Sequence, residues 1–197
     1  MSETATKDDI RRFWKSLYDS LYEDVDGTLT AEQLFTGIDD LEDMFRFRGH
    51  MATVEMPLGN LTGKRVLEVG PGAGGHSALF ARHGAFTSSA DITFDRARAT
   101  QAKFALMGDR AAGCQALQAD AETLPFDDDT FDIVYSNGVL HHTLDTERAI
   151  GEVHRVLKPG GQAVIMLLSN SGFRSPALPF HFPIAGDRVV SEVISGD

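Results

Sequence analysis

The sequence has almost no cysteine, little positive charge and no long hydrophobic run. Cys114 is the only cysteine in 197 residues, so no internal disulfide can form, and we expect a reducing, cytoplasmic compartment. Acidic residues outnumber basic ones by 29 to 18, which gives a formal net charge of −11. A surface of this sign repels phosphate backbones, so we expect no nucleic-acid partner. The polar N-terminus and the lack of a membrane-length apolar run predict neither a signal segment nor membrane association.

What the chain does contain is a glycine-rich turn directly after a short apolar run. Arg65–Val69 is rich in β-branched and aliphatic residues, as buried parallel strands are. Gly70, Gly72 and Gly75 fit G-x-G-x-x-G, and Gly70, Gly72 and Gly74 fit G-x-G-x-G. Glycines allow a sharp turn with positive φ, and they let a ligand lie against bare backbone at the start of a helix. This stretch therefore predicts a nucleotide-cofactor loop on an α/β sheet.

The glycines alone leave the cofactor open, because a dinucleotide would also suit them. With either cofactor, an acidic residue is expected after the second strand, and Asp91, which follows Ala85–Ala90, is in that place. Glu68, two residues before Gly70, and three downstream segments favour one of the two. These segments are Asp120–Phe126, Phe131–His142 and Arg155–Gly161. With E-V-G-P-G-A-G they resemble, in order and spacing over about residues 60–168, the class I S-adenosylmethionine-dependent methyltransferases.

The resemblance implies S-adenosyl-L-methionine as the cofactor, bound at Gly70, Gly72 and Gly74. Glu68 would hold its cationic amino end, directly or through the loop. Asp91 would bind the ribose hydroxyls, and Ile92 would pack on the adenine. Two alternatives stay open from the residues themselves: Glu68 bonds to backbone at the strand end, or Asp91 caps the next helix.

The turns after the third and fourth strands complete the expected cofactor site. Asp120 and Ala121 would meet the adenine rim, unless Asp120 only orders its own loop, and Glu122 is expected to be solvated. Asn137 and Gly138 leave the fourth strand at the edge of the sheet where ligands gather. In the resembled family this turn lies beside the transferable methyl group.

His141 and His142 are the candidate catalytic residues. A hydroxyl or protonated amine acceptor must lose a proton during methyl transfer, and histidine titrates in the right range for that. One of the pair, His141 first, could act as the base; alternatively both only shape the pocket or bond to backbone. Two adjacent histidines without further ligands do not predict a metal site, so no metal is expected.

The alternation of elements predicts a Rossmann-like, doubly wound, mostly parallel α/β sheet over residues 59–197, with an N-terminal helical lid over residues 1–58. Strands are expected at Arg65–Val69, Ala85–Ala90, Gln115–Ala119, Phe131–Ser136 and Ala163–Leu168. Helices are expected from Asp8 onward, from Thr30 through Ile38, around Leu41–Met51, and at Gly75–His83, Thr93–Leu106 and Asp145–Leu157, with Lys158–Gly161 ending the last one.

The first expected helix carries an aromatic stripe. Its apolar residues recur at helical spacing, so the stripe packs on the core or on a second subunit, or it covers the cofactor as a lid. The aromatic residues proposed for the pocket are Trp14, Tyr18, Tyr22 and Phe173.

The chain after Leu168 is shorter than the further helix and two strands usual in the resembled family. Ser169–Asp187 is expected to be loop, and Val189–Ile194 one short element. The fifth strand would then be an edge unless a loop or a second subunit covered it, which makes a homodimer one further expectation.

The functional prediction is methyl transfer from S-adenosylmethionine to an O, N or C nucleophile of a small molecule. Two alternatives remain. One is a non-catalytic module that binds the cofactor or oligomerises, and the other is an NAD-type oxidoreductase, which shares the glycines and Asp91.

Overall fold

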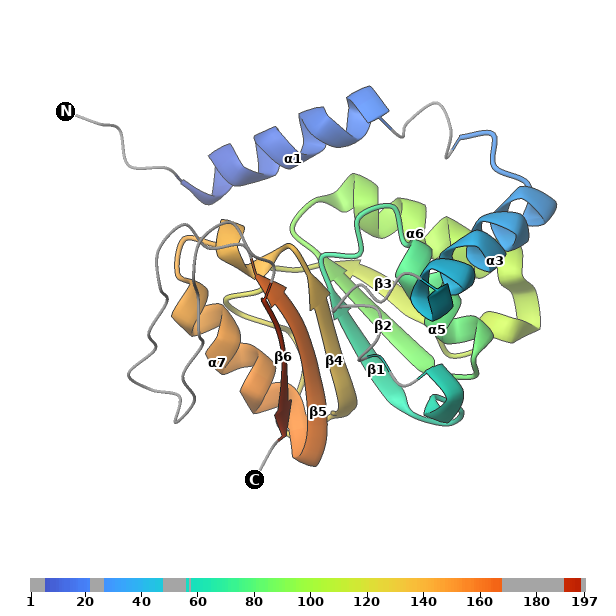
Figure 1. Ribbon diagram of the computed structural model, residues 1–197. Helices are drawn as coiled ribbons and strands as arrows, with labels where there is room; N and C mark the ends of the chain where they lie inside the picture. Colours follow the sequence, from blue (N-terminus) through green and yellow to red (C-terminus); the bar gives the residue numbers. More distant parts are fainter. Residues whose placement is uncertain (1–5, 22–26, 48–55, 57, 168–189, 196–197) are drawn as a thin grey trace.

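The computed structural model describes residues 6–21, 27–47, 56, 58–167 and 190–195, without the side chains of 45–47 and 190–195. They form a six-stranded sheet in the order β3-β2-β1-β4-β5-β6, with helices on both faces (Figure 1). The strands are β1 Arg65–Val69, β2 Phe86–Asp91, β3 Gln115–Gln118, β4 Phe131–Asn137, β5 Leu157–Leu167 and β6 Val190–Ser195. Strands β1 to β5 are parallel, and β6 runs antiparallel to β5. The predicted Rossmann-like, mostly parallel fold is confirmed.

Helices cover the sheet in two layers. On one face lie α3 (Ala31–Phe47), α5 (Gly75–Arg82) and α6 (Phe94–Met107), and on the other lies α7 (Thr146–Val156). Alternation along β1 separates the two cores, because Val66 packs with α3 and α5 whereas Leu67 and Val69 pack with α7. Short 3-10 turns, Leu58–Asn60, Gly108–Ala111 and Leu140–His142, connect the layers.

One helix, α3, replaces the described part of the two helical patterns predicted from Thr30 to Met51, of which residues 48–51 lie outside the described residues. The predicted capping box at its start is confirmed, since Thr30 N donates to Gln33 Oε1 at 2.9 Å and Gln33 N donates to Thr30 Oγ1 at 3.2 Å. The predicted break after Ile38 is wrong. Leu34, Ile38 and Leu41 form one apolar stripe at helical spacing that packs on the core, so the helix continues.

The second correction concerns β5, which begins at Leu157 and absorbs the turn expected at Lys158–Gly161. Leu157 pairs with Phe131, and the register then shifts before Ile133 pairs with Gln162, so the Pro-Gly-Gly run forms a bulge inside the strand. β5 is also not the edge of the sheet. It pairs over Gln162–Leu167 with β6, the short element expected near Val189–Ile194.

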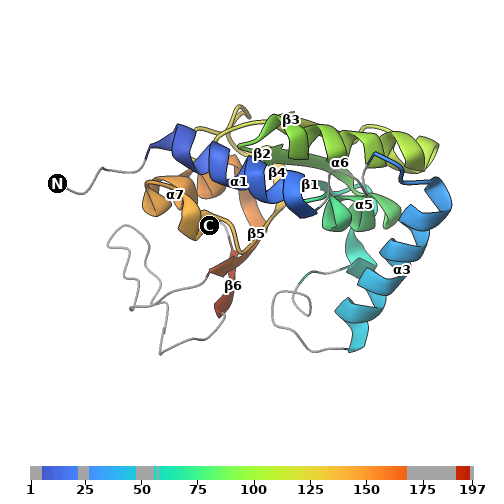
Figure 2. The same ribbon diagram turned by 90° about the horizontal axis from the view of Figure 1, so that it is seen from above.

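The first helix, α1 (Lys7–Leu21), lies across the carboxyl ends of the parallel strands rather than against either face of the sheet (Figures 1 and 2). Its Tyr18 is buried, while Phe13 and Leu21 are exposed. In the described part of the chain, no helix has both the length and the apolar character needed to span a membrane.

Candidate functional site

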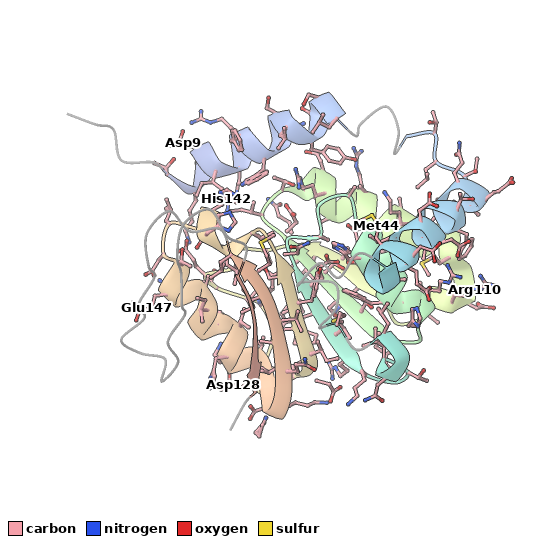
Figure 3. All side chains as sticks on the ribbon, viewed as in Figure 1. Asp9, Met44, Arg110, Asp128, His142 and Glu147 are labelled. Carbon is pink, nitrogen blue, oxygen red and sulfur yellow. The ribbon has the colours of Figure 1, made fainter. Side chains whose placement is uncertain are left out.

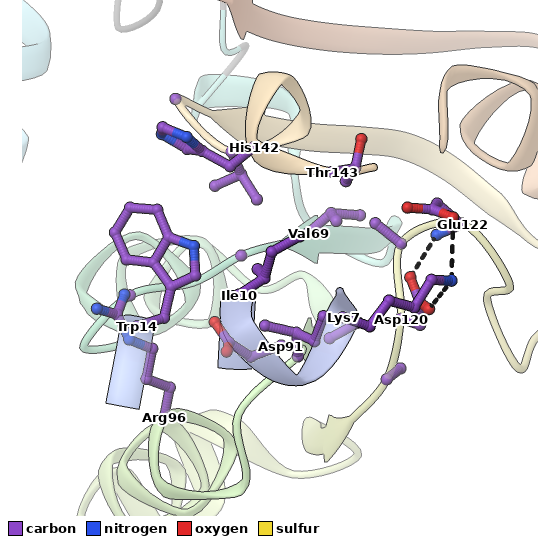
Figure 4. A pocket seen from close by; sticks show the side chains of 18 of the residues that line it. Lys7, Ile10, Trp14, Val69, Asp91, Arg96, Asp120, Glu122, His142 and Thr143 are labelled. Atoms are coloured by element: carbon purple, nitrogen blue, oxygen red, sulfur yellow. Dashed lines mark hydrogen bonds and ion pairs between the residues drawn. The ribbon is translucent and has the colours of Figure 1, made fainter. Parts of the chain in front are cut away.

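A cavity of about 230 Å³ lies between α1 and the carboxyl ends of β1 to β4 (Figure 4). Ligands of open α/β sheets bind at this edge. The cavity is lined by most of the predicted site residues: Gly70, Gly72, Asp91, Ile92, Asp120, Ala121, Asn137, Gly138 and His142. Three others, Glu68, Gly74 and His141, are not among its lining residues.

The glycines of the turn after β1 serve different purposes. All three have positive φ, which is +74° at Gly70, +58° at Gly72 and +83° at Gly74. A Cβ on Gly70 would lie 2.4 Å from Val139 Cγ2, and one on Gly74 would lie 2.6 Å from Thr100 Oγ1. Gly70 and Gly74 are therefore also required by packing, whereas Gly72 presents open backbone to the cavity.

Glu68 lies behind the glycine turn, and only 1 % of its surface is exposed. Ser77 Oγ donates a hydrogen bond to Glu68 Oε2, and His76 Nδ1 lies 3.4 Å from Glu68 Oε1. The carboxylate thus bonds to the first turn of α5. Any effect of Glu68 on a ligand in the cavity would pass through this turn.

Asp91 ends β2 at the cavity wall and is 5 % exposed. Its Oδ1 accepts hydrogen bonds of 2.8 Å from both the backbone N and Oγ1 of Thr93. Burial raises the pKa of Asp91 above its usual range, although the bonds from Thr93 and the charge of Arg96 oppose that shift. Thr93, not Asp91, is the N-cap of α6, so the capping alternative for Asp91 is wrong.

A cation that the sequence analysis did not identify, Lys7 on α1, joins two acids of the loop after β3. Lys7 Nζ hydrogen-bonds to Asp120 Oδ2 and lies 3.0 Å from Glu122 Oε2 (Figure 4). The expected solvation of Glu122 is wrong, because it is 5 % exposed and its Oε1 accepts from Leu144 N at 2.9 Å and Asp145 N at 3.2 Å. Burial raises the pKa of Asp120, but hydrogen bonds from Lys7 and from the backbone of Glu122 outweigh it, and the net pKa is lowered.

Two buried side-chain atoms of cavity residues have no hydrogen-bond partner among the described residues. These are Asn137 Oδ1, at the end of β4, and Arg96 Nε, on the first turn of α6. One is an acceptor and the other a donor. A buried polar group without a partner is costly, so a ligand that supplies partners gains affinity.

Trp14 of α1 lies between His142 and Arg96 (Figure 4). Its ring centroid is 4.9 Å from that of His142, with the planes at 67°, and Arg96 Cζ lies 5.3 Å from the indole centroid. Figure 3 shows His142 beneath α1. Partial burial lowers the pKa of His142, and burial together with His142 lowers that of His141 to about 4. A lowered pKa favours the neutral imidazole of His142, which lines the cavity, and this is the form that can accept a proton.

Of the other aromatic candidates for the pocket, Tyr18 of α1 is buried but is not among the lining residues, and Tyr22 and Phe173 lie outside the described residues. Within the described ranges, no group of three or more His, Cys, Asp or Glu side chains could hold a metal ion. Lys7 and Arg96 are the charged cavity residues that sequence reasoning missed. Arg96 had a usable signal, because it lies in the helix that directly follows Asp91.

Comparison with known proteins gives a consistent set of similarities. The family described as methyltransferase domain matches residues 67–165. The chain is 35% identical over 119 residues to demethylmenaquinone methyltransferase from Clavibacter sepedonicus, covering 60% of this chain and 45% of that protein. It is 36% identical over 101 residues to sterol 4-C-methyltransferase strm-1 from Caenorhabditis elegans, covering 50% and 29% respectively.

Among solved structures, an S-adenosylmethionine dependent methyltransferase from Mesorhizobium loti is 27% identical with a TM-score of 0.52, and the match covers 59% of this chain and 51% of that one. The chain thus spans about half or less of the length of these relatives.

Proposed function

Because the chain belongs to the class I S-adenosylmethionine-dependent methyltransferase family, we propose that it transfers a methyl group from S-adenosyl-L-methionine to a small-molecule acceptor. The family's cofactor carries the methyl on a cationic sulfur that leaves as a neutral thioether. The observation that carries the proposal is the convergence on one cavity of the glycine turn, Asp91, Asp120 and Asn137, which lie at or just after the carboxyl ends of four different strands.

The residues of the cavity fit this cofactor. Asp91 keeps a carboxylate at the end of β2, oriented by Thr93, where it can accept from the two ribose hydroxyls. Ile92 offers an apolar surface for the adenine, and Asp120 can accept from its exocyclic amine. The open backbone at Gly72 leaves room for close approach of the ligand. Glu68 acts indirectly in this proposal, by fixing the first turn of α5.

The acceptor would bind on the side of the cavity formed by α1 and His142. Ile10 and Trp14 give this wall an apolar and aromatic character. The relatives named above act on a demethylmenaquinone and a sterol, which are also largely apolar molecules, so we propose an apolar acceptor. The methyl group would go to an O, N or C atom of this acceptor, and mass spectrometry of the methylated product identifies which.

We assign the base to His142 rather than to His141, which the sequence had favoured. His142 lines the cavity, and a neutral imidazole nitrogen can take the proton of a hydroxyl acceptor as the new bond forms, or that of an ammonium acceptor before the nitrogen attacks. α1 would act as the lid that excludes water and aligns the acceptor. The other described helix of residues 1–58, α3, would not share that role, because it packs on the core.

Binding and turnover test the proposal separately. Trp14 is the only tryptophan in the chain and it lines the cavity, so its fluorescence reports ligands directly. S-adenosylhomocysteine should change this emission and bind in calorimetry, and Asp91→Ala should weaken that binding. In an assay with apolar ring acceptors, His142→Ala should lower kcat about 100-fold or more, and His141→Ala much less. Failure of the natural chain to bind S-adenosylhomocysteine would overturn the proposal.

Of the alternatives, the NAD-type oxidoreductase loses its basis because the family of the chain is a methyltransferase family. A non-catalytic module that binds the same cofactor is the second candidate. Binding of S-adenosylhomocysteine without transfer to any acceptor of the panel would favour it.

A further inference from the structure

Arg96 is a cavity residue whose guanidinium is not engaged in an ion pair with a described residue, although its charge acts on Asp91 at longer range. It lines the cavity, yet it forms no ion pair within 4 Å with any residue that the structure describes, and its Nε is buried without a hydrogen-bond partner. Its neighbour Arg98 differs, since it points outward with 63 % side-chain exposure and lies 3.6 Å from Asp95. An arginine at a cavity wall with an unused donor has its fork available for an anionic ligand group.

The position of the Arg96 guanidinium indicates which part of a ligand it would contact. Arg96 Nη1 lies 3.7 Å from where a Cβ on Gly72 would stand, so it lies against the open backbone of the glycine turn. On its other side, the indole of Trp14 lies 5.3 Å from Cζ and limits its movement. The guanidinium thus lies beside the turn after β1, and in Figure 4 Arg96 and Asp120, which is assigned to the adenine, lie on opposite sides of Asp91.

The second unmatched group, Asn137 Oδ1, is an acceptor on the same cavity. A donor without an acceptor and an acceptor without a donor match the two ends of an α-amino acid, whose carboxylate accepts and whose ammonium group donates. A ligand with only an anionic group would leave Asn137 Oδ1 without a donor, and a ligand with only a cationic group would leave Arg96 Nε without an acceptor.

We propose that Arg96 binds the carboxylate of the cofactor's amino-acid part and that Asn137 Oδ1 accepts from its ammonium group. This inference rests on the proposed function and assigns two residues to a part of the cofactor for which the sequence had offered only Glu68. Trp14 would then link the lid to the cofactor, because closing α1 fixes the guanidinium that holds the carboxylate.

Three ligands separate the parts of the cofactor in calorimetric titrations. S-adenosylhomocysteine carries both charged groups, decarboxylated S-adenosylhomocysteine carries only the ammonium group, and methylthioadenosine carries neither. For Arg96→Gln we expect about a 10- to 100-fold loss of affinity for S-adenosylhomocysteine and a change within about twofold for the other two. For Asn137→Ala we expect a loss for both amine-bearing ligands but not for methylthioadenosine.

Two controls guard against a general effect of the substitutions. Arg98→Gln, on the same helix and exposed, should leave all three affinities unchanged, and Arg96→Lys should restore part of the affinity for S-adenosylhomocysteine. Equal losses for S-adenosylhomocysteine and methylthioadenosine in Arg96→Gln would overturn the inference, since Arg96 would then serve the adenosine half. No loss for either ligand would overturn it as well, while leaving the proposed function intact. If the natural chain bound none of the three ligands, the proposed function and this inference would both fail.

Discussion

Replacing Lys7 tests how α1 is held over the cavity. Its ammonium group bonds to Asp120 and lies 3.0 Å from Glu122, and the exposed fractions of the three side chains are 34 %, 15 % and 6 %. Exposed ion pairs contribute about 0.2–1 kcal/mol, whereas breaking a fully buried pair costs about 3–5 kcal/mol. This partly exposed cluster lies between those limits, so we expect Lys7→Gln to weaken the docking of α1 by about 1–2 kcal/mol.

Hydrogen exchange of the α1 amides measures this docking, because a helix without a strand partner opens locally before the sheet unfolds. A loss of about 1–2 kcal/mol should speed their exchange about 5- to 30-fold. Lys15→Gln is the matched control on the same helix. Lys15 is 52 % exposed and lies 2.9 Å from Asp19 and 3.5 Å from Asp95, so its replacement should change the rates by less than about twofold. Unchanged exchange in Lys7→Gln, or an equal effect of Lys15→Gln, would refute this reasoning.

The pH dependence of the docking follows from the direction of the two pKa shifts. Hydrogen bonds to Asp120 and Glu122 raise the pKa of Lys7, so its contribution is present at neutral pH and lost only in strong alkali. The lowered pKa of Asp120 means that its contribution is complete above the ordinary carboxyl pKa of 3.8 and is lost as the pH falls below it. Exchange of the α1 amides, corrected for its intrinsic pH dependence, should therefore accelerate below about pH 4 but not between pH 6 and 8.

Three further predictions test the rest of the structure. Gly70→Ala should lower the free energy of unfolding in urea by more than about 2 kcal/mol, because it adds a clash with Val139 to the strain of a positive φ. Gly72→Ala should lower it by about 1 kcal/mol, from strain alone. Equal losses for the two variants would contradict this reasoning. The pKa of His141 is about 4 in the folded chain, against an ordinary value of 6.5, so the unfolded chain takes up the proton first as the pH falls. The free energy of unfolding should therefore decrease as the pH drops from 6.5 toward 4, and His141→Gln should reduce that decrease. Thr30→Ala should cost about 1 kcal/mol through loss of the capping box, and an unchanged urea midpoint would argue against it.

The strands of the sheet and its glycine turn could be predicted because their signals are local. Arg65–Val69 was predicted with the bounds that β1 has, since an apolar run before a glycine already marks a buried strand. The glycine turn could likewise be predicted from adjacent residues alone. The positive φ at Gly70 and Gly72 follows from the need to bring a helix N-terminus to the end of β1.

The misplaced boundaries arose where pairing or packing outweighed local propensity. The Pro-Gly-Gly run after Leu157 is typical of a turn, but a bulge opposite Phe131 keeps it within β5. Two helices were predicted where α3, Ala31–Phe47, is one, because the break was placed after Ile38 although the apolar stripe of α3 packs on one continuous core. Glu122 was expected in solvent because the backbone groups that it binds, at Leu144 and Asp145, lie more than twenty positions away in the sequence.

The cavity has a part that the sheet fixes and a part that α1 adds, and of the second part the sequence predicted Trp14 but not Lys7. Gly70, Asp91 and Asn137 stand at the ends of strands joined by hydrogen bonds, so the pattern of parallel strands fixes their spacing. Lys7 and Trp14 reach the cavity only because α1 docks there, through ion pairs and ring contacts without a strand register. Substitutions on α1 can therefore alter the wall nearest His142 while the strand ends keep their positions. Under the proposed function, the wall formed by α1 on the acceptor side would therefore vary more readily than the strand ends proposed to hold the cofactor.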